Sequence, residues 1–132
     1  APQQRTVMKI QPGRMDVQAI TAHGPGWVAV DHRQFTESLV LSSDGFLQRW
    51  NCDRFEDINA GHFTALAEHD CELVIFGSGN RLRFVHPQWT AALLERRIGI
   101  ETMDTAAACR TYNVLAGEGR KVVAALIVEP PA

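Results

Sequence analysis

Short stretches of alternating apolar and polar residues, separated by glycine-containing turns, fill the chain between about residues 17 and 50. This alternation is typical of strands that bury one face. It predicts strands at residues 17–21, 27–30, 35–41 and 46–50. The sequence SDG at residues 43–45 is typical of a hairpin turn, because glycine tolerates the positive φ that such turns require. The first half of the chain is therefore predicted to be an antiparallel meander.

From about residue 60 onward, helical and strand patterns alternate. Continuously apolar runs predict strands at residues 73–76 and 122–128, and such runs are typical of strands covered on both faces. A further strand is predicted between them at residues 100–103. Helical periodicity and capping residues predict helices at residues 61–68, 87–98 and 105–116. Strands separated by helices imply parallel crossovers. The predicted fold class is α/β, with a mixed sheet whose antiparallel meander is followed by parallel βαβ units.

The 3.6-residue period also predicts which side of each helix is buried. In the helix at 87–98, one broad side carries four large apolar residues: Trp89, Leu93, Leu94 and Ile98. In the helix at 105–116, the buried stripe is predicted to consist of Ala107, Ala108, Thr111, Val114 and Leu115. This phase leaves Cys109 and Asn113 off the stripe.

Composition places these elements in one domain. The chain has 132 residues, 45% of them apolar, which suffices for a real core. We expect a flexible arm at residues 1–15 and a single domain at 16–129. The formal net charge of −2 disfavours nucleic acid as a partner. The three cysteines are widely spaced and odd in number, which favours reduced thiols and a cytoplasmic location. No apolar run approaches the roughly 20 residues of a transmembrane segment.

Two polar loops follow predicted parallel strands directly. Gly77, Ser78 and Gly79 follow the first of these strands, and Asp104 and Thr105 follow the second. Because open α/β sheets bind ligands beyond the carboxyl ends of their strands, these residues are candidates for ligand binding. The alternative is a tight turn that needs the conformational freedom of glycine. The spacing lacks the third glycine of a dinucleotide fingerprint and the lysine of a P-loop.

Basic residues follow the glycine loop. If residues 81–84 are extended, Arg81 and Arg83 share one face, with Leu82 and Phe84 on the other. The two arginines are candidates to hold a small anionic ligand beside the glycine turn. The alternative is that both belong to a solvated rim.

A cysteine and an arginine near the start of the last helix complete the candidate set. A thiol at Cys109, flanked by Arg110, can have a lowered pKa near a helix start. The alternative is that Cys109 packs as a small apolar side chain. The five histidines share no metal-binding spacing and are expected to be isolated surface or capping residues. We therefore expect no catalytic residue, no metal site and no cofactor, and we lean against an enzyme.

Six short sequence motifs, in the same order along the chain, resemble those of a known family. They are GPGWV (24–28), FTESL (35–39), FGSG (76–79), RLRF (81–84), GIETMDT (99–105) and AACRTYN (107–113). Over about residues 16–128 the chain resembles the adipogenesis-associated Mth-like domain family. That family also includes the mitochondrial NADH dehydrogenase (complex I) assembly factor 3. The resemblance implies a three-layer α/β/α fold around a mixed sheet, and it implies no established enzyme activity or cofactor.

The sequence leaves three functions open. The first, favoured by the resemblance, is a non-enzymatic interaction or assembly factor with one or more protein partners. The second is a small-molecule binder or cryptic enzyme, with a pocket for an anionic ligand at the carboxyl ends of the parallel strands. The third is a structural domain whose motifs maintain the fold.

Overall fold

The computed structural model describes residues 17–131. The arm predicted at residues 1–15, and the first residue of the domain predicted at 16–129, lie outside this range. The strands are β1 (Ile20–Gly24), β2 (Trp27–Val30), β3 (Arg33–Phe35), β4 (Leu39–Ser42), β5 (Leu47–Arg49), β6 (Leu73–Gly77), β7 (Gly99–Met103) and β8 (Val122–Leu126). The α-helices are α1 (Ala60–Leu66), α2 (Ala91–Glu95) and α3 (Thr105–Gly117), and two short 3₁₀ helices are η1 (Phe55–Asp57) and η2 (Pro87–Thr90). None of the helices in this part of the chain is long and apolar enough to cross a lipid bilayer.

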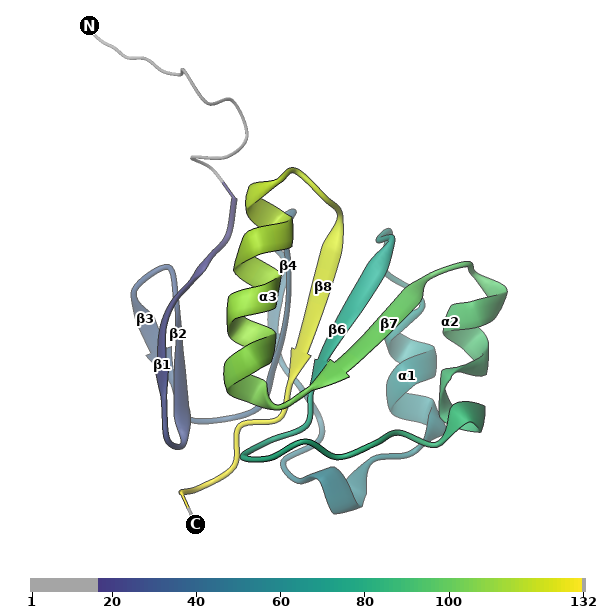
Figure 1. Ribbon diagram of the computed structural model, residues 1–132, viewed down its shortest axis with the longest axis horizontal. Helices are drawn as coiled ribbons and strands as arrows, with labels where there is room; N and C mark the ends of the chain where they lie inside the picture. Colours follow the sequence, from purple (N-terminus) through teal and green to yellow (C-terminus); the bar gives the residue numbers. More distant parts are fainter. Residues whose placement is uncertain (1–16, 132) are drawn as a thin grey trace, which may run out of the picture.

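Five strands form a mixed sheet in the order β5-β4-β8-β6-β7 (Figure 1). Strand β6 lies between β7 and β8 and pairs in parallel with both, whereas β4 pairs antiparallel with β8 and β5. Each interior strand divides its side chains between two cores with a period of two. In β8, Val122, Ala124 and Leu126 belong to one core, and Val123 and Ala125 belong to the other. The predicted α/β class, with antiparallel strands followed by parallel units, is confirmed.

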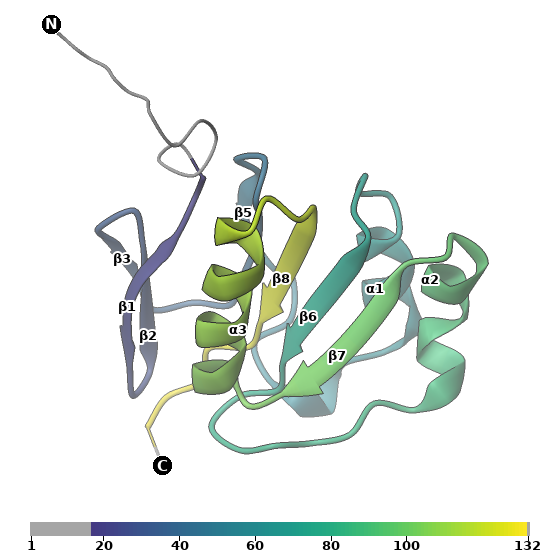
Figure 2. The same ribbon diagram turned by 45° about the horizontal axis from the view of Figure 1, so that its top comes forward.

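Three layers result from covering both faces of this sheet. Helix α3 and a separate three-stranded sheet (β1-β2-β3) pack on one face, and α1 and α2 pack on the other (Figures 1 and 2). The small sheet is attached to α3 by side chains of that helix. Asn113 accepts a hydrogen bond from the Ile20 N–H at 2.9 Å and donates one to the Ile20 carbonyl at 2.7 Å. The buried Tyr112 hydroxyl donates to the carbonyl of Gln18 at 2.7 Å.

The single strand predicted at residues 35–41 is wrong, because the chain changes sheets within it. Strand β3 ends at Phe35 in the small sheet, and β4 begins at Leu39 in the large one. The buried Ser38 fixes this crossing, since its hydroxyl accepts from the Val128 N–H at 3.0 Å and its carbonyl accepts from the Trp50 N–H at 2.8 Å. A predicted meander thus becomes a three-stranded sheet followed by a hairpin.

Two helix predictions also need correction. The helix predicted at 87–98 is a 3₁₀ turn followed by the short α2, and Leu94 is exposed rather than buried. In α3 the buried residues are Ala108, Cys109, Tyr112 and Ala116. Val114, predicted to be buried, is exposed. The buried stripe of α3 is therefore shifted by one residue from the predicted one.

Candidate functional site

The carboxyl ends of β6, β7 and β8 lie side by side, as predicted for the candidate loops. Strand β6 lies between the other two, so Ser78 follows it at the centre of this edge. Asp104 follows β7, and Glu129 follows β8 after two buried residues. The structure thus brings together the two loops singled out in the sequence and adds a third from the end of the chain.

Hydrogen bonds between the loops use most of their polar groups. The Thr105 hydroxyl accepts from the Gly79 N–H at 2.9 Å and donates to the Ile127 carbonyl at 2.7 Å. The Thr105 N–H donates in turn to the Gly79 carbonyl at 2.9 Å. The Ser78 hydroxyl donates to the Arg81 carbonyl at 2.8 Å and accepts from the Arg83 N–H at 3.0 Å. Because these groups are engaged with one another, Ser78, Gly79 and Thr105 act here as a structural junction.

Both glycines of the loop are required by its geometry. Gly79 has φ +106°, a conformation that other residues rarely adopt. A Cβ on Gly77 would lie 3.0 Å from the Thr105 hydroxyl and 3.1 Å from a Leu126 methyl group. The interpretation of this motif as a turn that needs glycine is therefore supported at Gly79 by φ and at Gly77 by close packing.

Arg83 does not belong to a solvated rim. Its side chain is only 16% exposed and lies 2.9 Å from the Glu129 carboxylate, whose side chain is 12% exposed. The same guanidinium donates to the Ser78 carbonyl at 2.7 Å, and its Cζ lies 5.9 Å from the centre of the Phe55 ring. Arg83 thus ties the loop after β6 to the segment after β8.

Glu129 is held in its charged form by its neighbours. Burial raises the pKa of this carboxyl. The Asn80 N–H, which donates to it at 2.7 Å, and the Arg83 guanidinium together lower the pKa by more than burial raises it. The net effect is a pKa below the ordinary value of glutamate. The Asn80 side chain donates to the Pro130 carbonyl at 2.9 Å, which secures the chain just beyond Glu129.

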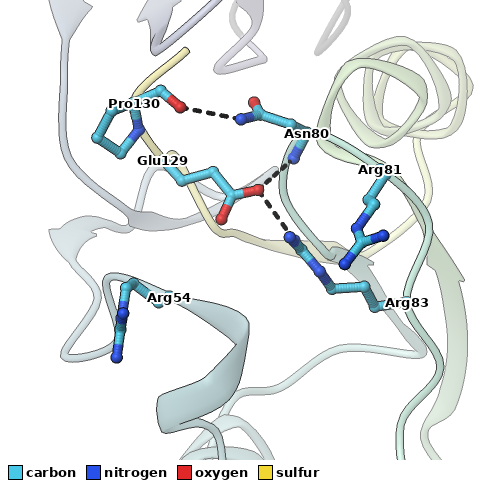
Figure 3. A pocket seen from close by; sticks show the side chains of 6 residues that line it. All are labelled: Arg54, Asn80, Arg81, Arg83, Glu129 and Pro130. Carbon is cyan, nitrogen blue, oxygen red and sulfur yellow. Dashed lines mark hydrogen bonds and ion pairs between the residues drawn. The ribbon is translucent and has the colours of Figure 1, made fainter. Parts of the chain in front are cut away.

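Around this ion pair lies an open pocket of about 510 Å³, which we call the arginine pocket. Its lining residues are Arg54, Asn80, Arg81, Arg83, Glu129 and Pro130 (Figure 3). Arg54 reaches it from the segment before η1, across from the loop that carries Arg81 and Arg83. Arg81 and Arg83, expected to share one side, both line this pocket, and their binding of an anion stays a prediction.

The apolar residues of the same segment are exposed. Leu82 is 48% exposed and Phe84 is 77% exposed, the highest value among the large apolar residues of the described chain. The inward course of Arg83 leaves these two side chains in solvent. Burial of an exposed aromatic ring against a partner is a common source of binding energy at protein interfaces.

The remaining candidates do not join the pocket. Asp104 is the N-cap of α3, where its carboxylate accepts from the Ala107 N–H at 2.8 Å. Arg110 is exposed on α3. Cys109, predicted to project off the apolar stripe, is instead fully buried in the core, and burial raises the pKa of its thiol to about 12. That environment is the opposite of an activated thiolate.

Sequence reasoning missed Arg54, Asn80 and Glu129 as parts of the site. Glu129 is the first polar residue after a long apolar run, and that position was the available signal. Arg54 lies far from the loops along the chain, so no local pattern connects it to them. Within residues 17–131, no group of three or more histidine, cysteine, aspartate or glutamate side chains is placed to hold a metal ion. His62 is a capping residue, as expected, because its ring nitrogen accepts from the Asn59 N–H at the start of α1.

Comparison with known sequences places the chain in a family. The sequence profile described as "Protein of unknown function (DUF498/DUF598)" matches residues 20–127. The chain belongs to this family. The mouse NADH dehydrogenase [ubiquinone] 1 alpha subcomplex assembly factor 3 is 39% identical over 107 residues, which are 80% of this chain and 57% of the mouse protein. The chain therefore spans little more than half the length of this curated relative.

Solved structures of family relatives share the fold. A crystal structure of a protein from Bordetella parapertussis is 34% identical, with a TM-score of 0.80 over 88% of this chain and 97% of the other. A solution structure of a Mth938-like domain from Bordetella pertussis is 28% identical, with a TM-score of 0.76 over 97% and 94% of the two chains. The resemblance to Mth-like domains, and to the family that includes complex I assembly factor 3, is confirmed.

Proposed function

We propose that this protein is a non-enzymatic interaction or assembly factor that binds a protein partner through residues 81–84. The observation that carries this proposal is the exposure of Leu82 and Phe84 on a loop whose base is fixed by the Arg83–Glu129 ion pair. Exposed apolar side chains on a mobile loop can turn inward. On an anchored loop they stay available for a partner at a small entropic cost of binding.

The relatives support the same proposal. The mouse relative is named as an assembly factor for NADH dehydrogenase, and its matched region covers most of this chain. Assembly factors act through contacts with other proteins, so a preserved domain with a presented apolar loop suits that role. The match covers 57% of the mouse protein, so a partner within NADH dehydrogenase is a proposal for this chain.

We place this interaction in the cytoplasm. The cysteines Cys52, Cys71 and Cys109 are all free thiols. Unpaired cysteines are typical of proteins that work in a reducing compartment.

Quantitative affinity purification from the native host tests the proposal. The tagged wild-type chain is expected to recover a stoichiometric partner, and the Leu82→Ser/Phe84→Ser variant is expected to recover at least ten-fold less. The matched control is Leu94→Ser/Val114→Ser, because these residues are 65% and 59% exposed but lie on α2 and α3. Absence of a stoichiometric partner, or equal losses in the two variants, contradicts the proposal.

A second candidate function is the binding of a small anionic molecule, and the arginine pocket favours it. Three guanidinium groups and one carboxylate line that pocket. A thermal-shift screen with inorganic phosphate, nucleotides and phosphorylated metabolites tests it. A ligand at 100 times its Kd stabilises the protein by about 2.7 kcal/mol, and Arg81→Gln is expected to abolish the shift. If no compound stabilises the wild type, this candidate fails.

A further inference from the structure

The arginine pocket carries a surplus of positive charge. Arg83 is neutralised by Glu129 at 2.9 Å, and Arg54 is partly offset by Asp57 at 3.6 Å on the surface. Arg81 has no carboxylate within 4.0 Å among residues 17–131, and it is exposed. The Nε of Arg83 is buried and has no hydrogen-bond partner among the same residues. The lining therefore contains three positively charged side chains and only one carboxylate.

This surplus is local. The chain as a whole has a formal net charge of −2, so the pocket differs in sign from the molecule that carries it. A positive site on a net-negative protein attracts a locally placed carboxylate, whereas a polyanion such as nucleic acid meets overall repulsion. Guanidinium groups also match carboxylates geometrically, because their parallel N–H groups can donate to both oxygens.

The positive pocket and the exposed apolar residues belong to one short segment. Arg81 and Arg83 line the pocket, and Leu82 and Phe84 alternate with them along the chain. A partner that crosses this segment meets charge and apolar surface within four residues. The pocket is also open, and its lining residues come from three separate segments of the chain, which suits a crossing polypeptide segment.

We propose that the partner presents an acidic segment in which carboxylate side chains alternate with apolar ones. Its carboxylate binds in the arginine pocket beside Arg54 and Arg81, and its apolar side chains pack on Leu82 and Phe84. This inference rests on the function proposed above and adds the chemistry of the partner's binding segment.

NMR titration of the ¹⁵N-labelled protein with short peptides tests the inference. The probe is a blocked pentapeptide that alternates glutamate with leucine and phenylalanine, and its controls carry glutamine or lysine in place of glutamate. We expect the acidic peptide to shift the amides of residues 80–84 and 54, with an affinity that falls as salt is added. Arg81→Glu is expected to weaken binding at least ten-fold. Arg110→Glu, which reverses an exposed arginine on α3, is expected to leave binding unchanged.

Several results overturn the inference. They are the absence of shifts at millimolar peptide, equal shifts with the glutamine or lysine peptide, and equal losses from the Arg81→Glu and Arg110→Glu variants. Free glutamate or phosphate that shifts the same amides with equal affinity identifies a small-anion site instead. A native complex that needs Leu82 and Phe84 but tolerates Arg81→Glu also overturns it, while the interaction function itself stands.

Discussion

Gly79 offers a direct way to measure how rigidly the loop after β6 is held, because the chain contains a matched control for it. Gly79 has φ +106° and Gly45 has φ +105°, so alanine meets the same unfavourable φ at either position. That strain is about 1–2 kcal/mol. A Cβ on Gly45 meets no atom within 4 Å, so strain is the whole expected effect there.

At Gly79 the added Cβ also collides with the ion pair. It would overlap Glu129 Oε1 and lie 2.6 Å from Arg83 Nη1. The Glu129 oxygen holds two donors, the Asn80 N–H and the Arg83 guanidinium, so it cannot move without weakening both hydrogen bonds. Each hydrogen bond to a charged group contributes about 1.5–3 kcal/mol, which we reduce for the residual exposure of both side chains. We therefore expect Gly79→Ala to destabilise the fold by about 2 kcal/mol more than Gly45→Ala.

Urea and thermal unfolding of the two variants measure this difference. Thermal midpoints should differ by about 8 °C, at roughly 4 °C per kcal/mol for a chain of this size. In a Glu129→Ala background the extra effect of Gly79→Ala should largely disappear, because the colliding carboxylate is gone. If Gly79→Ala and Gly45→Ala are equally destabilising in the wild-type background, the loop is not anchored by this ion pair and the reasoning fails.

Three further predictions concern other parts of the molecule. Because the folded state lowers the pKa of Glu129, its stabilising effect is present above about pH 4.5 and lost as the pH falls through the folded value, so Glu129→Gln should flatten that acid limb of the stability curve. An unchanged acid limb contradicts this. Cys109 should resist iodoacetamide at pH 7.5 while the half-buried Cys71 reacts, as read by peptide mass spectrometry; fast alkylation of Cys109 in the folded protein would revive an activated thiol. Asn113→Ala should destabilise the fold by about 1–3 kcal/mol and speed amide exchange at Ile20, whereas unchanged exchange means that the small sheet is attached by packing alone.

The elements with the strongest apolar patterns were predictable from the sequence. β6 and β8 are continuously apolar because both faces of the sheet are covered, and periodicity found them directly. β8 ends at Leu126 rather than at the predicted residue 128, yet Ile127 and Val128 stay buried as the pattern indicated. Burial, more than hydrogen bonding, is what such a pattern reports.

The phase of α3 shows where the same reasoning loses information. Three successive alanines at residues 106–108 give the start of the helix no marked apolar side, so the stripe can be placed one residue early. In the structure, Tyr112 is buried on the true stripe. Its hydroxyl donates a hydrogen bond to the Gln18 carbonyl, 94 positions away in the sequence. A distant partner of this kind leaves no local signal.

The site was predictable only in outline. Its place at the carboxyl ends of the parallel strands followed from topology, and both arginines of the loop do line one pocket. The inward course of Arg83 was not predictable, because it depends on Glu129, a residue from the far end of the chain. Alternation along residues 81–84 indicated two sides, and tertiary contacts withdrew only Arg83 from solvent.

Hydrogen-exchange mass spectrometry of the recovered complex tests the central claim, that residues 81–84 form the partner-binding surface. The free chain and its purified complex are compared peptide by peptide. We predict that formation of the complex slows exchange in peptides covering residues 80–86, while exchange in peptides covering α3 is unchanged. Protection that appears on α3 or elsewhere, with residues 80–86 exchanging as in the free chain, would place the interface on another surface and contradict the account.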